Sequence, residues 1–242
     1  GRIWLVWQSL RNSNSDIYLM SCDNGTWSEP VQVTTDPAND WEPKVAVDSK
    51  GTVWIAWDSF RYGNYDVLMR SYAEGQLSDI ITLASSRDFE ARVSMAIDRE
   101  DRIWLAWDHG DDRWGKDNPG SSHLTSGGWK AQYKGVSMRE NDEVPWQAGG
   151  LRRTEYIDVR VYDDGTLYQT TQPVTGNFHK DLQDFHEFPT LHIDGSGNVW
   201  LFFRHAVPIV GKTHSERNSW NQHATFFNGS EWTPPVVLPR GN

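Results

Sequence analysis

Val53-Trp54-Ile55-Ala56-Trp57 is one of four closely similar segments in this chain. The others are Ile3-Trp4-Leu5-Val6-Trp7, Ile103-Trp104-Leu105-Ala106-Trp107 and Val199-Trp200-Leu201-Phe202-Phe203. The first three begin 50 residues apart, at residues 3, 53 and 103, whereas the fourth begins at residue 199. A unit of about 40–50 residues with four strands is typical of a β-propeller blade. The repeats therefore predict an all-β propeller of four-stranded antiparallel blades.

The same pattern surrounds each of these segments. A strand that ends in aspartate precedes three of them, over residues 44–48, 94–98 and 190–194, and a tight turn joins the two. A third strand ends in a hairpin signal such as Asn24-Gly25 or Asp164-Gly165. A fourth, continuous strand is expected over residues 27–34, 77–83, 167–174 and 232–238, and its prolines suit the outer edge of a blade. We expect one domain over 1–242, with blades at about 1–35, 41–84, 89–174 and 187–239.

The first blade differs from the others because the chain opens directly on its second strand. Its innermost strand is therefore missing from the pattern. We expect the four visible repeats to be a segment of a larger propeller, with a closed four-bladed ring as the alternative.

Composition narrows the possible functions. The formal net charge is −10, which disfavours nucleic acid as a partner because such binding depends on Lys and Arg that neutralise phosphates. No apolar run is long enough to span a membrane. Cys22 is the only cysteine, so no disulfide can form within the chain. The compartment stays open, with an extracytoplasmic (periplasmic or secreted) location slightly favoured.

An insertion over residues 109–153 sets the third blade apart. It lies between Trp107 and Tyr156, where the first two blades need only a short hairpin, and it explains the doubled interval before the fourth repeat. Long loops in compact domains are usually functional or disordered, and this one is rich in Trp and Gly. We expect it to line or cover a binding site on the face with the long connections. A structural flap is the alternative. The ligand-binding candidates here are Asp108, His109, Arg113, Trp114, Lys116 and Arg152.

Arginines begin the connections on this same face. Arg11 and Arg61 occupy equivalent positions in the first two blades, and Arg204 followed by His205 ends the corresponding strand of the fourth. Guanidinium groups from several blades can grip a carboxylate sugar or another anion. The alternative is that a repeated hairpin arginine holds its own loop.

Carboxylates are equally frequent. Asp58 and Asp108 match across blades at the end of the tryptophan strand. Such groups can act as acid and base on a glycosidic bond, bind Ca²⁺, or accept backbone N–H groups where strands begin. The last of these is the favoured interpretation. The eight histidines show no zinc-like spacing. We predict no cofactor, with Ca²⁺ as a weak alternative.

Two resemblances carry these expectations further. Ser21-Cys22-Asp23-Asn24-Gly25-Thr26-Trp27 is similar to the Asp-box turn of sialidase-type propellers, but its tryptophan comes one residue early. The run 41–48, with residues 53–59, 63–67 and Trp114-Gly115-Lys116-Asp117, resembles the propeller-like region of an uncharacterised bacterial family. That resemblance implies a metal-dependent hydrolase domain after the propeller, whose His/Asp motifs are absent here.

The resulting functional hypothesis is a ligand- or partner-binding propeller module of a larger bacterial protein. It recognises a glycan or another polar ligand through the face with the insertion. Its partners include the remaining blades or the hydrolase domain. The alternative is a carbohydrate-active enzyme, either a sialidase-like glycoside hydrolase or a polysaccharide lyase, with an Arg/Asp/His site on that face. A purely structural fragment is the third possibility.

Overall fold

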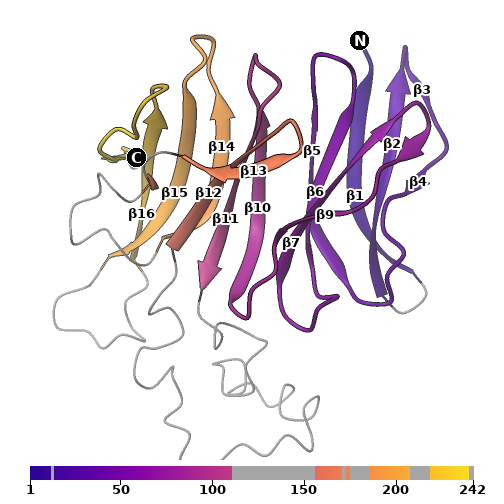
Figure 1. Ribbon diagram of the computed structural model, residues 1–242, viewed down its shortest axis with the longest axis horizontal. Helices are drawn as coiled ribbons and strands as arrows, with labels where there is room; N and C mark the ends of the chain where they lie inside the picture. Colours follow the sequence, from indigo (N-terminus) through magenta and orange to yellow (C-terminus); the bar gives the residue numbers. More distant parts are fainter. Residues whose placement is uncertain (12–13, 111–155, 171–172, 175–185, 208–218, 240–242) are drawn as a thin grey trace, which may run out of the picture.

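A computed structural model describes residues 1–11, 14–110, 156–170, 173–174, 186–207 and 219–239. These residues form four antiparallel sheets arranged as blades, which stand side by side from the N-terminal sheet at the right of Figure 1 to the C-terminal sheet at the left. The predicted all-β propeller architecture is confirmed. The described part of the chain has no helix that is long and apolar enough to cross a membrane.

The first two blades follow the predicted strand order. Blade 1 contains β1 (Ile3–Arg11), β2 (Asn14–Asp23), β3 (Thr26–Trp27) and β4 (Val31–Gln32). Blade 2 contains β5 (Asp40–Val47), β6 (Val53–Ser59), β7 (Asp66–Ala73), β8 (Gln76–Leu77) and β9 (Ile81–Ala84). No described strand pairs with the inner edge of β1, so blade 1 lacks its innermost strand within the described residues.

The other two blades repeat this order. Blade 3 contains β10 (Phe89–Ile97), β11 (Ile103–Gly110), β12 (Tyr156–Asp163) and β13 (Thr166–Gln169). Blade 4 contains β14 (His186–Ile193), β15 (Val199–Val207), β16 (Ser219–Phe227) and β17 (Val236–Val237). The insertion 109–153 connects β11 to β12, and all of it except His109 and Gly110 lies outside the described residues.

The outer strand is shorter and more broken than the sequence suggests. In blade 1 it consists of two short pieces, β3 and β4. Between them, the Ser28 hydroxyl accepts the Ser21 N–H at 3.0 Å, in the place of a strand carbonyl. Ser78 does the same for Ser71 in blade 2, at 2.9 Å. A side-chain hydroxyl can substitute for a ladder hydrogen bond in this way, which lets the strand bend without losing its contact with the blade.

The core lies between the blades, because the tryptophan strands β6 and β11 are buried on both faces. Val53, Ile55 and Trp57 face blade 1, whereas Ala56 faces blade 3. The second residue of each of the first three tryptophan strands packs its indole ring against an aromatic ring of the next blade. Trp4 contacts Tyr72, Trp54 contacts Tyr162 and Trp104 contacts Phe227, with ring centroids 5.8, 5.7 and 5.4 Å apart.

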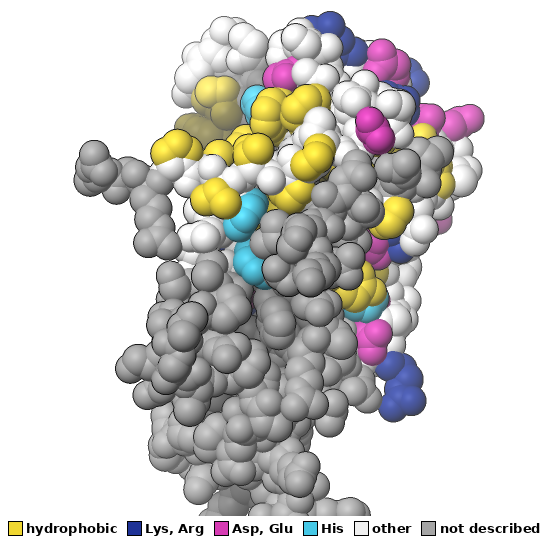
Figure 2. Space-filling view, turned by 90° about the vertical axis from the view of Figure 1, so that its left-hand side faces the viewer, with side chains coloured by type: hydrophobic (Ala, Val, Ile, Leu, Met, Phe, Trp, Pro, Cys, Tyr) yellow, Lys and Arg dark blue, Asp and Glu magenta, His cyan; other side chains and the backbone are white. Residues whose placement is uncertain are grey.

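The outer face of blade 4 also carries packed aromatic rings, although no described blade covers it. The Trp200 ring stacks on Phe202 and lies tilted against Phe226, both of its own sheet, with ring centroids 6.0 and 4.8 Å away. Figure 2 looks at this end of the row of blades and shows hydrophobic side chains gathered there, with histidines among them.

Candidate functional site

The site begins with a strained position in three inner strands. β5, β10 and β14 each contain a bulge near the start, and the bulge residues Glu42, Arg92 and Phe188 have φ values of 47°, 59° and 59°. Non-glycine residues rarely adopt this left-handed conformation, and it persists only where the surroundings impose it. The repetition in three blades shows that the bulge is part of the blade design.

The preceding blade supplies what holds each bulge. The backbone N–H of Glu42 donates to Gln8 Oε1 at 2.7 Å, that of Arg92 to Asp58 Oδ2 at 2.7 Å, and that of Phe188 to Asp108 Oδ1 at 2.9 Å. Gln8, Asp58 and Asp108 hold the same position on β1, β6 and β11. These side chains therefore fasten each blade to the next.

Both aspartates of this series are buried, at 2% and 0% exposure. Burial raises the pKa of Asp58 to about 7, against the opposing effect of the Arg92 N–H. Burial also raises the pKa of Asp108 to about 7, although the Arg92 guanidinium opposes the shift. These contacts match the interpretation in which the aspartates accept backbone N–H groups.

The fourth member of the series is a cation. Arg204 stands on β15 where Asp58 and Asp108 stand on β6 and β11, and it pairs in register with Glu187 of β14. Its Nε and Nη2 groups lie 2.8 and 2.6 Å from Glu187 Oε1. Arg204 therefore cannot accept a backbone N–H as its counterparts do. It binds Glu187 of its own blade instead.

Arg204 belongs to a stack of alternating cations and rings. The guanidinium carbon of Arg92 lies 4.2 Å from the Phe188 ring centroid, and that of Arg204 lies 4.0 Å from the same ring. Arg204 is also 4.3 Å from the Trp220 ring. We call Arg92, Phe188, Arg204 and Trp220 the Arg–aromatic ladder. Each cation–ring contact of this kind contributes about 0.5–2 kcal/mol.

Two buried carboxylates hold the cations of the ladder in place through ion pairs. Arg92 Nη1 lies 2.6 Å from Asp108 Oδ2 and 3.5 Å from Glu187 Oε2, and both carboxylate side chains have no exposed surface. The side chains of Arg92 and Arg204 remain 19% and 30% exposed, and Phe188 is 44% exposed. The ladder thus presents guanidinium and ring surface to solvent in a fixed geometry.

The hairpin arginines of the first two blades lie elsewhere. Arg11 is 4.3 Å from the Tyr18 ring, and its Nε group donates to Ser9 Oγ at 3.4 Å. Arg61 Nε donates to Ser59 Oγ at 3.3 Å, and its Nη2 lies 3.7 Å from Asp40. Both contacts hold the arginine against its own blade. Neither residue joins Arg204 in the ladder.

The two predicted histidines occupy separate, largely buried places. His109 Nε2 lies 3.1 Å from Asp88, and its ring stacks on Tyr156 with centroids 4.6 Å apart. His205 contacts the rings of His186 and His223, at 5.3 and 5.8 Å. Arg113, Trp114, Lys116 and Arg152 lie outside the described residues. Among the described residues, no group of His, Cys, Asp and Glu could hold a metal ion.

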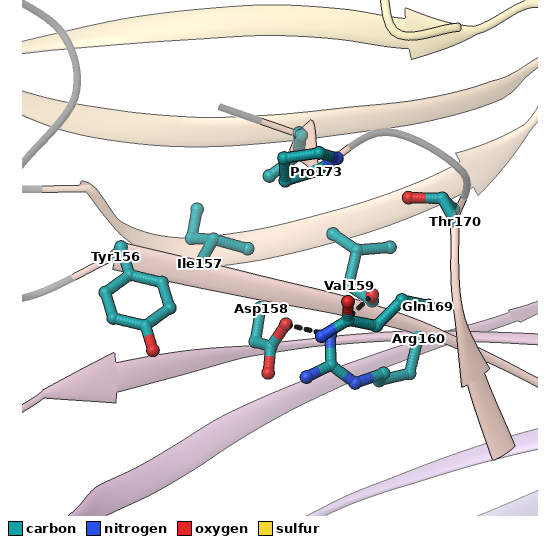
Figure 3. A pocket seen from close by; sticks show the side chains of 9 residues that line it. Tyr156, Ile157, Asp158, Val159, Arg160, Gln169, Thr170 and Pro173 are labelled. Atoms are coloured by element: carbon teal, nitrogen blue, oxygen red, sulfur yellow. Dashed lines mark hydrogen bonds and ion pairs between the residues drawn. The ribbon is translucent and has the colours of Figure 1, made fainter. Parts of the chain in front are cut away.

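A small cavity of about 180 Å³ opens on β12, apart from the ladder (Figure 3). Tyr156, Asp158 and Arg160 line one side, and Arg160 forms an ion pair with Asp158. The Gln169 amide, with its oxygen toward the guanidinium, accepts from Arg160 at 2.8 Å. The cavity is smaller than the roughly 300–1,000 Å³ of most ligand pockets. None of its lining residues was predicted from the sequence.

The ladder contains three residues that the sequence analysis missed, namely Arg92, Phe188 and Trp220. Their types differ from those at matching places in other blades, and the bulge that places them side by side leaves no recognisable residue pattern. The one available signal was the position of Arg204. It breaks the series of acceptors formed by Gln8, Asp58 and Asp108.

Comparisons with known proteins show the fold. No protein-family model matches the chain, and no curated protein matches it. A Dyadobacter fermentans protein of unknown function has a similar structure, with a TM-score of 0.57, 11% identity, and coverage of 98% of this chain and 65% of that one. An ulvan lyase from a new polysaccharide lyase family, solved with -[GlcA(1-4)Rha3S]- bound, gives a TM-score of 0.58 at 10% identity and covers 96% and 54%.

A xylan β-1,4-xylosidase from Bacillus halodurans is also similar. Its TM-score is 0.50 at 10% identity, with coverage of 100% of this chain and 45% of that one. This chain therefore spans about half to two thirds of the length of these structures. Two of the three structural neighbours are carbohydrate-active enzymes, and at this identity the likeness establishes the fold alone.

Proposed function

We propose that this chain is the glycan-binding propeller module of a larger bacterial protein, and that it binds acidic oligosaccharides at the Arg–aromatic ladder. The observation that carries the proposal is the fixed position of Arg204. Its guanidinium is held between the Phe188 and Trp220 rings and anchored by the buried Glu187. A cation immobilised before binding loses little entropy when a ligand arrives.

The chemistry of the ladder suits a sugar that carries a carboxylate. The contacts of Arg204 with Glu187 use Nε and Nη2, and Nη1 has no acceptor among the described residues. Nη1 and the second N–H of Nη2 form one edge of the guanidinium group. Such an edge pairs with planar anions through two parallel hydrogen bonds. The exposed edge of the Phe188 ring adds an apolar surface beside the charge, a combination common in binding sites for polar ligands.

The structural neighbours support a glycan as the ligand class. They include a lyase solved with a GlcA-containing saccharide and a xylosidase. We extend the proposal to an extracytoplasmic location, where polysaccharides are encountered, and to remaining blades or a hydrolase domain as intramolecular partners. Binding is favoured over catalysis here because Asp58 and Asp108 already accept backbone N–H groups between blades.

The test is a calorimetric titration with three ligands of matched length. These are hexagalacturonate, its fully methyl-esterified form and xylohexaose. The proposal predicts binding of the free acid and a loss of at least tenfold in affinity on esterification, because one hydrogen-bonded charge pair contributes about 1.5–3 kcal/mol. Binding of none of the three ligands would contradict the function. Equal binding of all three would contradict the acidic class alone.

Variants locate the site. Arg204→Gln removes the charge and leaves a shorter polar side chain, so the affinity for hexagalacturonate should fall at least tenfold. Arg11→Gln is the matched control, since Arg11 stands at the same end of the blades and outside the ladder. An equal loss in both variants would point to nonspecific charge attraction. Release of unsaturated or reducing ends during incubation would contradict a binding role and favour the enzyme alternative.

A further inference from the structure

The inner edge of β1 is long and unpaired within the described part of the chain. β1 runs over Ile3–Arg11, and in every other blade the equivalent strand pairs on this side with β5, β10 or β14. The strand also exposes apolar side chains, with Ile3, Leu5 and Leu10 at 62%, 44% and 76% exposure. Proteins rarely leave a long apolar edge uncovered, because it offers unpaired backbone groups to any other strand.

The other blades show what normally covers this edge. An aspartate directly follows each of their inner strands and accepts an indole N–H from the tryptophan strand of the same blade. Asp48 accepts from Trp54 at 3.1 Å, Asp98 from Trp104 at 2.8 Å, and Asp194 from Trp200 at 2.9 Å.

Each aspartate also shapes the turn between the two strands. Asp98 Oδ1, for example, accepts the backbone N–H groups of Glu100 and Arg102 at 3.1 and 2.9 Å. Asp48 and Asp194 receive the same pair of bonds in their own turns. One carboxylate therefore closes the turn and fixes the tryptophan side chain. The same arrangement occurs in blades 2, 3 and 4.

Within the described residues, blade 1 has the tryptophan of this arrangement but not the aspartate. Trp4 occupies the position of Trp54, Trp104 and Trp200, and it packs on Tyr72 of blade 2 as Trp54 packs on Tyr162. Its Nε1 group has no acceptor among the described residues. The position is thus suited to an inner strand that is directly followed by an aspartate.

We infer that β1 binds the inner strand of a further propeller repeat, antiparallel, with its terminal aspartate on Trp4 Nε1. Main-chain hydrogen bonds give strand addition its affinity, and side-chain pockets give it specificity. A second copy of this chain fits less well. Pairing of β1 with another β1 brings no carboxylate, since Ile3–Arg11 contains no acidic residue.

The experiment supplies such a strand as a synthetic peptide. The probe is a fluorescein-labelled peptide with the sequence of residues 40–48, and the readout is anisotropy with the intact chain. Control peptides carry the Asp48→Ala change or a scrambled order. We expect saturable binding of the first peptide, binding weakened about two- to tenfold by the change, and none of the scrambled peptide. Hydrogen exchange should show new protection over Ile3–Arg11.

A variant of the protein isolates the predicted contact. Trp4→Phe keeps an aromatic ring on Tyr72 and removes the indole N–H. The 40–48 peptide and its Asp48→Ala form should therefore bind this variant with equal affinity. The inference is overturned if the 40–48 peptide does not bind. It is also overturned if Asp48→Ala in the peptide weakens binding to Trp4→Phe as much as it weakens binding to the unaltered protein. It is also overturned if sedimentation without peptide shows a dimer in which β1 is already protected.

Discussion

The Asp58 carboxylate accepts the backbone N–H of Arg92 at 2.7 Å, across the boundary between two blades. The same carboxylate accepts the Val93 N–H at 3.2 Å. One side chain thus satisfies two N–H groups that the bulge in β10 leaves without a strand partner. A buried N–H without an acceptor costs about 1–3 kcal/mol.

Asp58→Ala should therefore lower the free energy of unfolding by about 2–4 kcal/mol, because two buried donors lose their acceptor. Urea denaturation followed by tryptophan fluorescence measures the change. Asp163→Ala is a suitable control, since Asp163 ends β12 at the opposite end of the blades. A loss below about 0.5 kcal/mol in Asp58→Ala would show that the bulge is held by other contacts.

The turn aspartates should have a comparable effect. Asp98→Ala removes the acceptor of the Trp104 indole and of two backbone N–H groups. We expect a loss of about 2–3 kcal/mol in the free energy of unfolding. Glu100→Ala, in the same turn, removes a side chain that is 67% exposed and should change stability by less than about 0.5 kcal/mol. Equal effects of the two changes would contradict the role given to Asp98.

Stability should also depend on pH through Asp66. Burial raises the pKa of this carboxyl to about 7, and the nearby charge of Glu90 adds to the shift. The folded state thus holds a proton that the unfolded state releases near pH 4, so this contribution is present at low pH and lost as the pH rises toward 7. Asp66→Asn should be more stable than the unaltered protein at pH 8, by on the order of 2 kcal/mol.

The check is a set of urea denaturations between pH 4 and pH 8. Other buried carboxyls also titrate in this range, so the informative quantity is the difference between the two proteins. That difference should shrink as the pH falls from 8 toward 4. A difference that stays constant with pH would mean that Asp66 is already ionised in the folded state at low pH.

Arg92 should matter more for stability than Arg204. It neutralises Asp108 and Glu187, which have no exposed surface, whereas Arg204 pairs among the described residues with Glu187 alone. Removing one partner of a buried ion pair costs up to about 3–5 kcal/mol. Arg92→Gln should therefore lower the thermal midpoint clearly more than Arg204→Gln. The reverse order would contradict the central place of Arg92 in the ion-pair network.

The sequence predicted the blades well because their signals are local and repeated. The tryptophan strands, the aspartates that end the inner strands and the Asn-Gly and Asp-Gly turns each act within one blade. The preference for Asp58 and Asp108 as backbone acceptors also agrees with their contacts. Their partners could not be named in advance, because those lie in the next blade and at a bulge.

The ladder was beyond sequence reasoning for a related reason. Phe188 meets Arg92 and Arg204 only because two bulged strands bring residues 92, 188 and 204 together. The outer strands were predicted as continuous, and the hydroxyls of Ser28 and Ser78 interrupt them. Both features depend on one side chain replacing a backbone partner, which a pattern of hydrophobic residues does not record.

A crystal structure with hexagalacturonate bound tests the central claim most directly. The account predicts a sugar carboxylate within hydrogen-bonding distance of Arg204 Nη1 and a sugar ring against the exposed edge of the Phe188 ring. Ligand density confined to the cavity beside Asp158 and Arg160, or an empty ladder in crystals grown at saturating ligand, would contradict it.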